Sequence, residues 1–139
     1  MRNQHDRGVT LVELLVVIAV VAILASLVYP SYQNHILKTR YADGKAKLHE
    51  IIQRQRRYFT NNNTYTLSLT GDLGYEDAGG GAVASENAFY LITAVQCGPD
   101  NDVPLSDCVE LSAAATFANG GVALTYNTLN QKGGPDKAW

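Results

Sequence analysis

The sequence has little charge and no strong excess of one sign. Asp, Glu, Lys and Arg make up 17% of its 139 residues, against about 25% in typical soluble domains, and the formal net charge is −2. A chain without a basic excess has no overall field that attracts nucleic acid, so DNA contact would need a local basic patch. The length is that of a single domain, so we do not expect a multidomain enzyme.

The sequence also lacks a pattern of residues for catalysis or metal binding. Its two cysteines permit at most one internal disulfide, and they lack the two further ligands of a tetrahedral zinc site. His5, His35 and His49 have no evident nucleophile or metal partner. Asp100 and Asp102 suggest calcium, but no Gly or Glu follows at the positions that an EF-hand loop requires, which leaves only an irregular site. We therefore expect no enzyme activity, no cofactor and no metal.

The shortage of charge is concentrated near the N-terminus. Between Val9 and Tyr29, 21 residues carry one ionisable side chain, Glu13, and a helix of that length is about 31 Å long, enough for a bilayer core. A cleavable secretory signal ending near Ala22 is an alternative, as is an ordinary signal anchor. A carboxylate inside the run argues against the cleavable signal, because a charge costs about 2.5–3.5 kcal/mol at mid-bilayer. The signal anchor stays an alternative.

The residues Gly8-Val9-Thr10-Leu11-Val12-Glu13, followed by the apolar run and Pro30, resemble the type IV prepilin signature. The resemblance implies that a prepilin peptidase removes residues 1–8 between Gly8 and Val9 and methylates Val9. The family usually has Phe at the position of Val9, so cleavage is implied more strongly than methylation. The resemblance also implies that Glu13 pairs with the N-terminus of another subunit during assembly. Pro30 predicts a helix kink or local melting.

Beyond Pro30 the pattern predicts an amphipathic continuation of the same helix. Asp43 with Lys47 and Glu50 with Arg54 have the spacing of helical ion pairs, and three consecutive Asn at 61–63 predict the helix end. The apolar stripe comprises Tyr41, Leu48, Ile51, Ile52, Gln55, Tyr58 and Phe59. The bases Arg54, Arg56 and Arg57 beside Tyr58 and Phe59 could contact nucleic acid, but cations at a helix C-terminus and aromatics in the core are the favoured interpretation.

The remaining chain predicts a surface loop and a small sheet. Thr64 to Ala88 is rich in glycine and poorly patterned, as in a loop. Three strand-like runs follow, Phe89 to Cys97, Val109 to Phe117 and Val122 to Leu129, with a hairpin signal at Asn119-Gly120. An antiparallel meander covering the amphipathic helix is the simplest arrangement, which makes the fold class α+β.

Pairing of the first two strands would bring Cys97 and Cys108 together. A disulfide between them is compatible with an oxidising compartment, the periplasm or the cell exterior. The tail resembles the end of minor pilins of the PilE type, which commonly finish in Cys-Trp. Here Ala138 precedes Trp139, so the exact subgroup is not carried over.

We therefore predict a type IV pilin fold in three parts: a cleaved leader (1–8), a membrane and filament-core helix (9–36) and a globular head (37–139). The expected function is a structural subunit, minor rather than major, of a type IV pilus, which supports assembly, adhesion or twitching motility. The expected partners are other pilins, prepilin peptidase, the assembly machinery and the bacterial inner membrane, with the head in the periplasm before export. The alternatives are a type II secretion pseudopilin and a filament-displayed adhesin or DNA-binding pilin; no residue pattern supports a DNA or host-surface partner.

Overall fold

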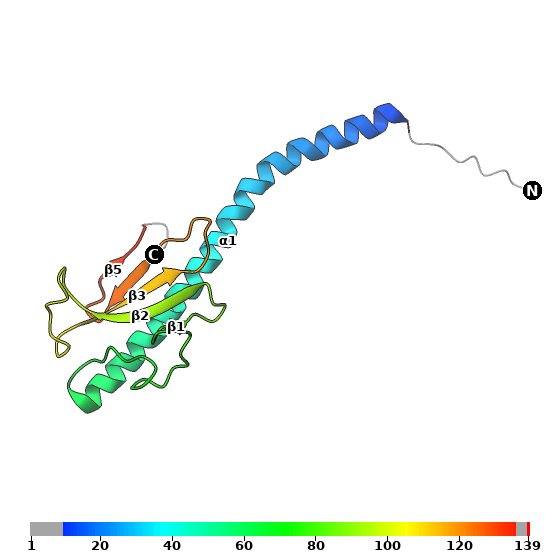
Figure 1. Cartoon of the computed structure of the whole chain (residues 1–139). Coiled ribbons are helices and arrows are strands. Elements are labelled where there is room, and N and C mark those ends of the chain that lie inside the picture. The colour runs from blue at the N-terminus through cyan, green and yellow to red at the C-terminus, as the bar shows by residue number, and fades with distance from the viewer. Residues whose placement is uncertain (1–9, 136–138) are drawn as a thin grey trace, which may run out of the picture. The chain divides into compact units, whose positions relative to one another are not determined.

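A computed structural model describes residues 10–135 and 139, with the side chains of residues 27–31 left out. It contains one long helix, α1 (Leu11–Asn62), and an antiparallel sheet of five strands in sequential order. The strands are β1 (Val83–Ala84), β2 (Tyr90–Gln96), β3 (Val109–Ala115), β4 (Leu124–Asn127) and β5 (Lys132–Gly133). The chain separates into two compact units, Met1–Ile36 and Leu37–Trp139. The predicted α+β fold is confirmed (Figure 1).

Residues next to each end of α1 explain where the helix starts and stops. The N–H of Glu13 donates to the Thr10 hydroxyl at 3.3 Å, so Thr10 satisfies one of the unpaired donors of the first turn. At the other end Asn63 adopts a φ of +54°, the left-handed conformation in which helices commonly stop. The asparagine stop is therefore confirmed. The helix runs through Pro30 without a break, and a kink there stays a prediction.

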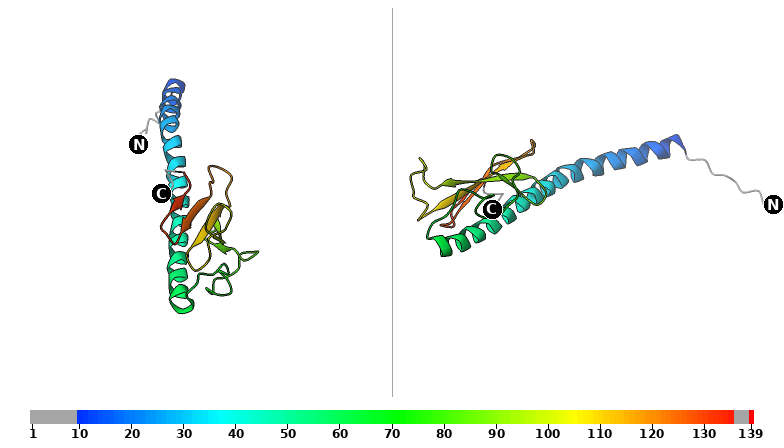
Figure 2. Two further views of the ribbon diagram at one scale, coloured as in Figure 1. Left: turned by 90° about the vertical axis from the view of Figure 1, so that its left-hand side faces the viewer. Right: turned by 60° about the horizontal axis from the view of Figure 1, so that its bottom comes forward.

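The core of the head lies between one face of the sheet and the second half of α1. Leu48, Ile51 and Ile52 of the helix are buried against Tyr90, Ile92, Leu111, Ala113 and Leu124 of the strands. Burying each large aliphatic side chain contributes about 1.5–3 kcal/mol. Figure 2 shows the sheet lying along one side of this part of the helix. The predicted alternation holds over the first residues of β2 and β3 and at Leu124 and Tyr126 of β4.

Helix and sheet approach most closely at Gly44, in the interior of α1. A Cβ atom placed on Gly44 would lie 2.6 Å from Cδ2 of Tyr90, a contact that side chains essentially never make. Tyr90 is fully buried, and its hydroxyl donates to the carbonyl of Val122 at 3.2 Å. Gly44 therefore makes room for an aromatic ring of β2 against the helix backbone.

The strand prediction was incomplete in two places. β1 and β5, each of two residues, fall in segments expected to be loop or tail. The connection from β3 to β4 is longer than a two-residue turn, and at Asn119-Gly120 only Gly120 has positive φ. Tyr41 of α1 donates its hydroxyl proton to the Gly120 carbonyl at 2.8 Å, and this hydrogen bond holds the β3–β4 loop against the helix.

The predicted disulfide is confirmed. Cys97 and Cys108 are bonded, with Cα atoms 5.7 Å apart, and both are buried at the ends of β2 and β3. The bond closes the loop 98–107. Within the described residues, a search for a helical stretch with the length and apolarity needed to cross a membrane finds none.

The Gly44 contact predicts that Gly44→Ala destabilises the head. Alanine would ordinarily favour a helix interior by about 1 kcal/mol, but its methyl group would overlap the Tyr90 ring, and overpacking costs about 1–3 kcal/mol. Urea unfolding followed by circular dichroism should show a lower free energy of unfolding. In a Tyr90→Leu background the same change should be neutral or stabilising. A stabilising effect in the otherwise unchanged protein would contradict the contact.

Candidate assembly and recognition surfaces

The first half of α1 is an exposed apolar surface. Its large aliphatic side chains between Leu11 and Leu24 are 49–76% exposed. A contiguous apolar surface of this kind marks a site for membrane or protein contact. Glu13 lies in the first turn of this helix and is exposed. The structure therefore places one carboxylate at the start of an uncovered apolar helix.

The predicted site residues have different outcomes. Gly8 and Val9, the predicted cleavage and methylation positions, lie outside the described residues. Thr10 caps the start of α1, a structural role that the sequence pattern was not used to predict. The signal was present, because Thr10 and Glu13 have the Thr-x-x-Glu spacing of a capping box at a helix start.

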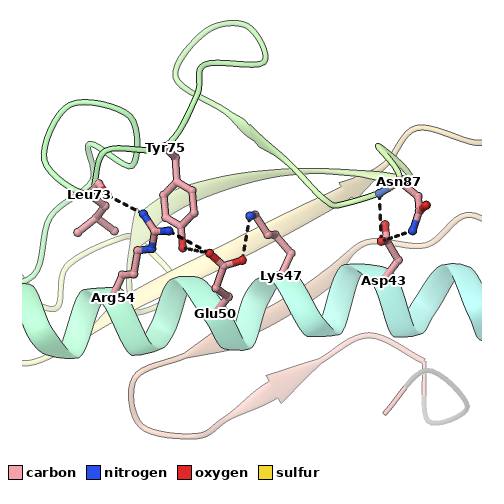
Figure 3. Close-up of polar contacts among 7 residues, drawn as sticks. All are labelled: Asp43, Lys47, Glu50, Arg54, Leu73, Tyr75 and Asn87. Atoms are coloured by element: carbon pink, nitrogen blue, oxygen red, sulfur yellow. Dashed lines mark hydrogen bonds and ion pairs between the residues drawn. The ribbon is translucent and has the colours of Figure 1, made fainter.

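A network centred on Glu50 holds the α1–β1 loop against the head half of the helix (Figure 3). One carboxylate oxygen of Glu50 lies 2.9 Å from Lys47 Nζ. The other lies 3.3 Å from Arg54 Nη2 and accepts the Tyr75 hydroxyl proton at 3.0 Å. Arg54 also donates to the Leu73 carbonyl at 3.1 Å. These contacts attach the loop at Leu73 and Tyr75, and we call them the Glu50 network.

The Glu50 network changes the acidity of its members. Burial by itself would raise the pKa of Glu50, but hydrogen bonds from Lys47 and Tyr75 and the positive charges of Lys47 and Arg54 lower that pKa overall. Burial, together with the hydrogen bond to Glu50 and its negative charge, raises the pKa of Tyr75. Lys47 and Arg54 also lie over the Tyr75 ring, at 4.7 and 4.0 Å from its centroid. The arrangement is therefore built for a charged Glu50 and a neutral Tyr75.

Of the two predicted helical ion pairs, Glu50 with Arg54 is confirmed and Asp43 with Lys47 was wrong. Asp43 does not pair with Lys47; its Oδ1 accepts the backbone N–H and the side-chain amide of Asn87, at 3.2 and 2.9 Å (Figure 3). Lys47 pairs with Glu50 instead. A residue 44 positions away competes for Asp43, so helical spacing alone does not decide its partner. Burial and the neighbouring Tyr41 and Asp43 raise the pKa of Tyr90 to about 12.

The arginine cluster at the end of α1 does not form one basic site. Arg54 belongs to the Glu50 network, Arg56 donates to Asn130 Oδ1 at 3.1 Å, and Arg57 lines an open cavity of about 410 Å³ with Tyr58 and Asp72. A second cavity of about 420 Å³ lies beneath the α1–β1 loop and is lined by both signs of charge. Among the described side chains no group of three His, Cys, Asp or Glu could hold a metal.

The charges of the head are segregated along the chain. The helical segment 38–57 carries seven Lys and Arg and two acids, whereas the segment 58–131 carries eight acids and no Lys or Arg. Counting charge by segment would have revealed this from the sequence. The second half of α1 is therefore basic, while the loops between residues 63 and 108 are acidic.

Two family profiles match the chain. Residues 30–122 match the family profile described as "Type IV minor pilin ComP, DNA uptake sequence receptor", and residues 3–29 match the prokaryotic N-terminal methylation motif. The chain belongs to the type IV pilin family. No solved structure matches this pilin.

Curated relatives of this pilin are fimbrial proteins. It is 37% identical to the fimbrial protein EcpC of Eikenella corrodens, over 94% of this chain and 80% of that protein. It is 28% identical to a type IV major fimbrial protein FimA of Dichelobacter nodosus, over 69% of this chain and 62% of that one. Identity to the wide pilus component PilA4 of Thermus thermophilus is 36%, over 50% and 56%. Against five relatives other than EcpC, the match spans only 33–62% of their own length.

The Glu50 network predicts a pH-dependent contribution to the stability of this pilin. Because the pKa of Glu50 is lowered by folding, its contribution is present above the ordinary glutamate pKa and is lost as the pH falls through the folded-state value. Glu50 is 44% exposed, so solvent screening limits the contribution to about 1 kcal/mol at most.

Urea unfolding at neutral pH and near pH 3 tests this prediction. Glu50→Gln should lower the free energy of unfolding at neutral pH, and the difference from the unchanged protein should vanish in acid. Glu86→Gln, which removes an exposed carboxylate on the β1–β2 turn, is the matched control and should have little effect. An equal loss at both pH values would show that the charge of Glu50 is not what stabilises the loop.

Proposed function

We propose that this pilin is a structural subunit, of the minor class, of a type IV pilus. The observation that carries the proposal is the exposed apolar half of α1 with Glu13 in its first turn. Such a helix needs lipid or other helices around it, and a bundle of pilin helices supplies that environment in a filament. The match of residues 30–122 to a minor pilin profile supports the minor class. We assign a structural role rather than an enzymatic one.

Maturation at the N-terminus follows from the same proposal. We propose that prepilin peptidase cleaves between Gly8 and Val9 and methylates the new N-terminal Val9. The match of residues 3–29 to the N-terminal methylation motif supports this assignment. Cleavage places a new amine one helical turn from Glu13, next to the positive end of the helix dipole.

Glu13 is proposed as the residue that directs assembly. An ionised carboxylate among apolar side chains is costly in lipid, and the N-terminal amine of a neighbouring subunit offsets that cost by pairing with it. Before assembly the helix 9–36 anchors the chain in the inner membrane, with the head in the periplasm. A disulfide such as Cys97–Cys108 is formed and kept in that compartment. After assembly the head lies on the extracellular filament.

A second candidate function is DNA reception. The matching family profile is described as a DNA uptake sequence receptor, which favours this candidate. The acidic segment 58–131 opposes it, because eight acids without a single Lys or Arg repel a polyanion. Filter binding of labelled duplex DNA to residues 37–139 at low and moderate salt measures the interaction directly, and binding that weakens with salt would support it.

The proposal predicts that Glu13→Ala prevents incorporation into the filament and leaves the protein in the membrane. Loss of one charged contact worth about 1.4 kcal/mol lowers an equilibrium tenfold, so the amount in sheared pili should fall about tenfold or more while the membrane fraction stays unchanged. Immunoblots of the two fractions measure this. Glu13→Asp, which keeps the carboxylate at the same position, is the control and should incorporate better than Glu13→Ala. Normal incorporation of Glu13→Ala would remove the assembly role of Glu13.

A further inference from the structure

One side of the helix carries a line of basic side chains that the loops of the head do not neutralise. Lys38, Lys45, His49 and Arg56 are separated by seven, four and seven residues. At 100° per residue they lie within about 40° of one another around the axis, and the line is about 27 Å long at 1.5 Å per residue. All four are at least partly exposed. We call this line the basic stripe.

Contacts from the C-terminal strands extend the basic stripe. The His49 ring packs on Tyr126 at 4.7 Å between centroids and lies 6.3 Å from the Trp139 ring. Lys132 of β5 lies over the same Trp139 ring at 5.1 Å. The β5 lysine therefore joins the stripe beside His49. No Asp or Glu occurs between residues 111 and 135, the segment that supplies these strands.

The acids of the helix lie on its other side. Asp43 and Glu50 are separated by seven residues and lie more than about 100° from the stripe. Both already have partners there, Asn87 for Asp43 and the Glu50 network for Glu50. Among the described residues 38–56 of α1, no acid therefore lies on the side of the basic stripe, and the charge of the stripe is available to an external partner.

The complementary charge is on the same chain. The disulfide-closed loop 98–107 carries Asp100, Asp102 and Asp107, all exposed, and no Lys or Arg. This loop belongs to the segment of eight acids and no bases described above. A second copy of the chain therefore offers these acids to the stripe, and its own stripe remains free to bind the acids of a further copy.

We propose that the basic stripe of one subunit docks on the acidic disulfide loop of a second copy of this chain. The contact rests on the proposed function, since it orients heads that the N-terminal helices have brought together. Its role is registration between neighbouring heads. Exposed charge pairs set orientation and association rate more than total affinity.

A zero-length cross-linking experiment on the full chain tests the contact. Equal amounts of ¹⁴N-labelled and ¹⁵N-labelled protein in detergent are mixed and treated with a carbodiimide, which joins a lysine amine to a carboxylate only when the two touch. Mass spectrometry should find mixed-isotope peptides that join Lys38, Lys45 or Lys132 to the loop 98–107. Their yield should fall several-fold when salt is raised from about 50 mM to about 500 mM, because screening shortens the reach of charge.

Charge-reversal variants test whether the contact depends on the charges of the stripe and the loop. Lys45→Glu with Arg56→Glu should reduce the mixed-isotope peptides from Lys38 and Lys132 several-fold, and Asp100→Lys with Asp102→Lys in the same chain should restore contact. Arg57→Glu, a single charge reversal that lies off the stripe, is the matched control for Arg56→Glu alone. The folded state of each variant is checked by circular dichroism.

The outcomes separate this inference from the proposed function. Absence of mixed-isotope links between the stripe and the loop, in protein that enters sheared pili normally, overturns the docking and leaves the pilus role intact. Absence of the unchanged protein from pili would count against the pilus role. Loss of duplex DNA binding in Lys45→Glu with Arg56→Glu, with the links unchanged or absent, would identify the stripe as a DNA contact and overturn the docking as well.

Discussion

The structure depends on the burial of one apolar stripe of α1 beneath the sheet. Leu48, Ile51 and Ile52 are covered by β2, β3 and β4, and the close approach at Gly44 lets the Tyr90 ring lie against the helix backbone. This contact determines which side of the helix is inside the head. It also determines which sides of α1 stay polar, because a helix that packs along one apolar stripe exposes its other sides to loops or to partner molecules.

The two halves of the continuous helix α1 differ in which part of their surface is apolar and in what covers it. The second half is amphipathic, and its own sheet covers its apolar stripe. The first half is apolar over nearly its whole surface and has only Glu13 as an ionisable side chain from residue 11 to residue 26. A helix that is apolar all round requires lipid or other helices. The pilin family assignment explains why a chain would carry such a surface, and we propose that the acid in its first turn sets the register of neighbouring helices.

Much of the fold could be predicted from the sequence, since local patterns encode it. The apolar stripe, the stop at Asn63, the three longer strands and the disulfide each depend on spacing within a short window. The partners of Asp43 and Tyr41 could not be predicted, because Asn87 and Gly120 are brought to them only by the folded chain. β1 and β5 are too short to show alternation. The segregation of charge was readable but needed counting by segment, and the roles of Gly8 and Val9 stay predictions because they lie outside the described residues.

The central claim is that this chain is processed as a prepilin before it enters a filament. The most direct test is the intact mass and N-terminal peptide of the protein recovered from sheared pili. The account predicts a chain that lacks residues 1–8 and begins at Val9 with one added methyl group. A chain in the filament fraction that retains its leader, or one cleaved after Ala22 as a secretory signal would be, would contradict it.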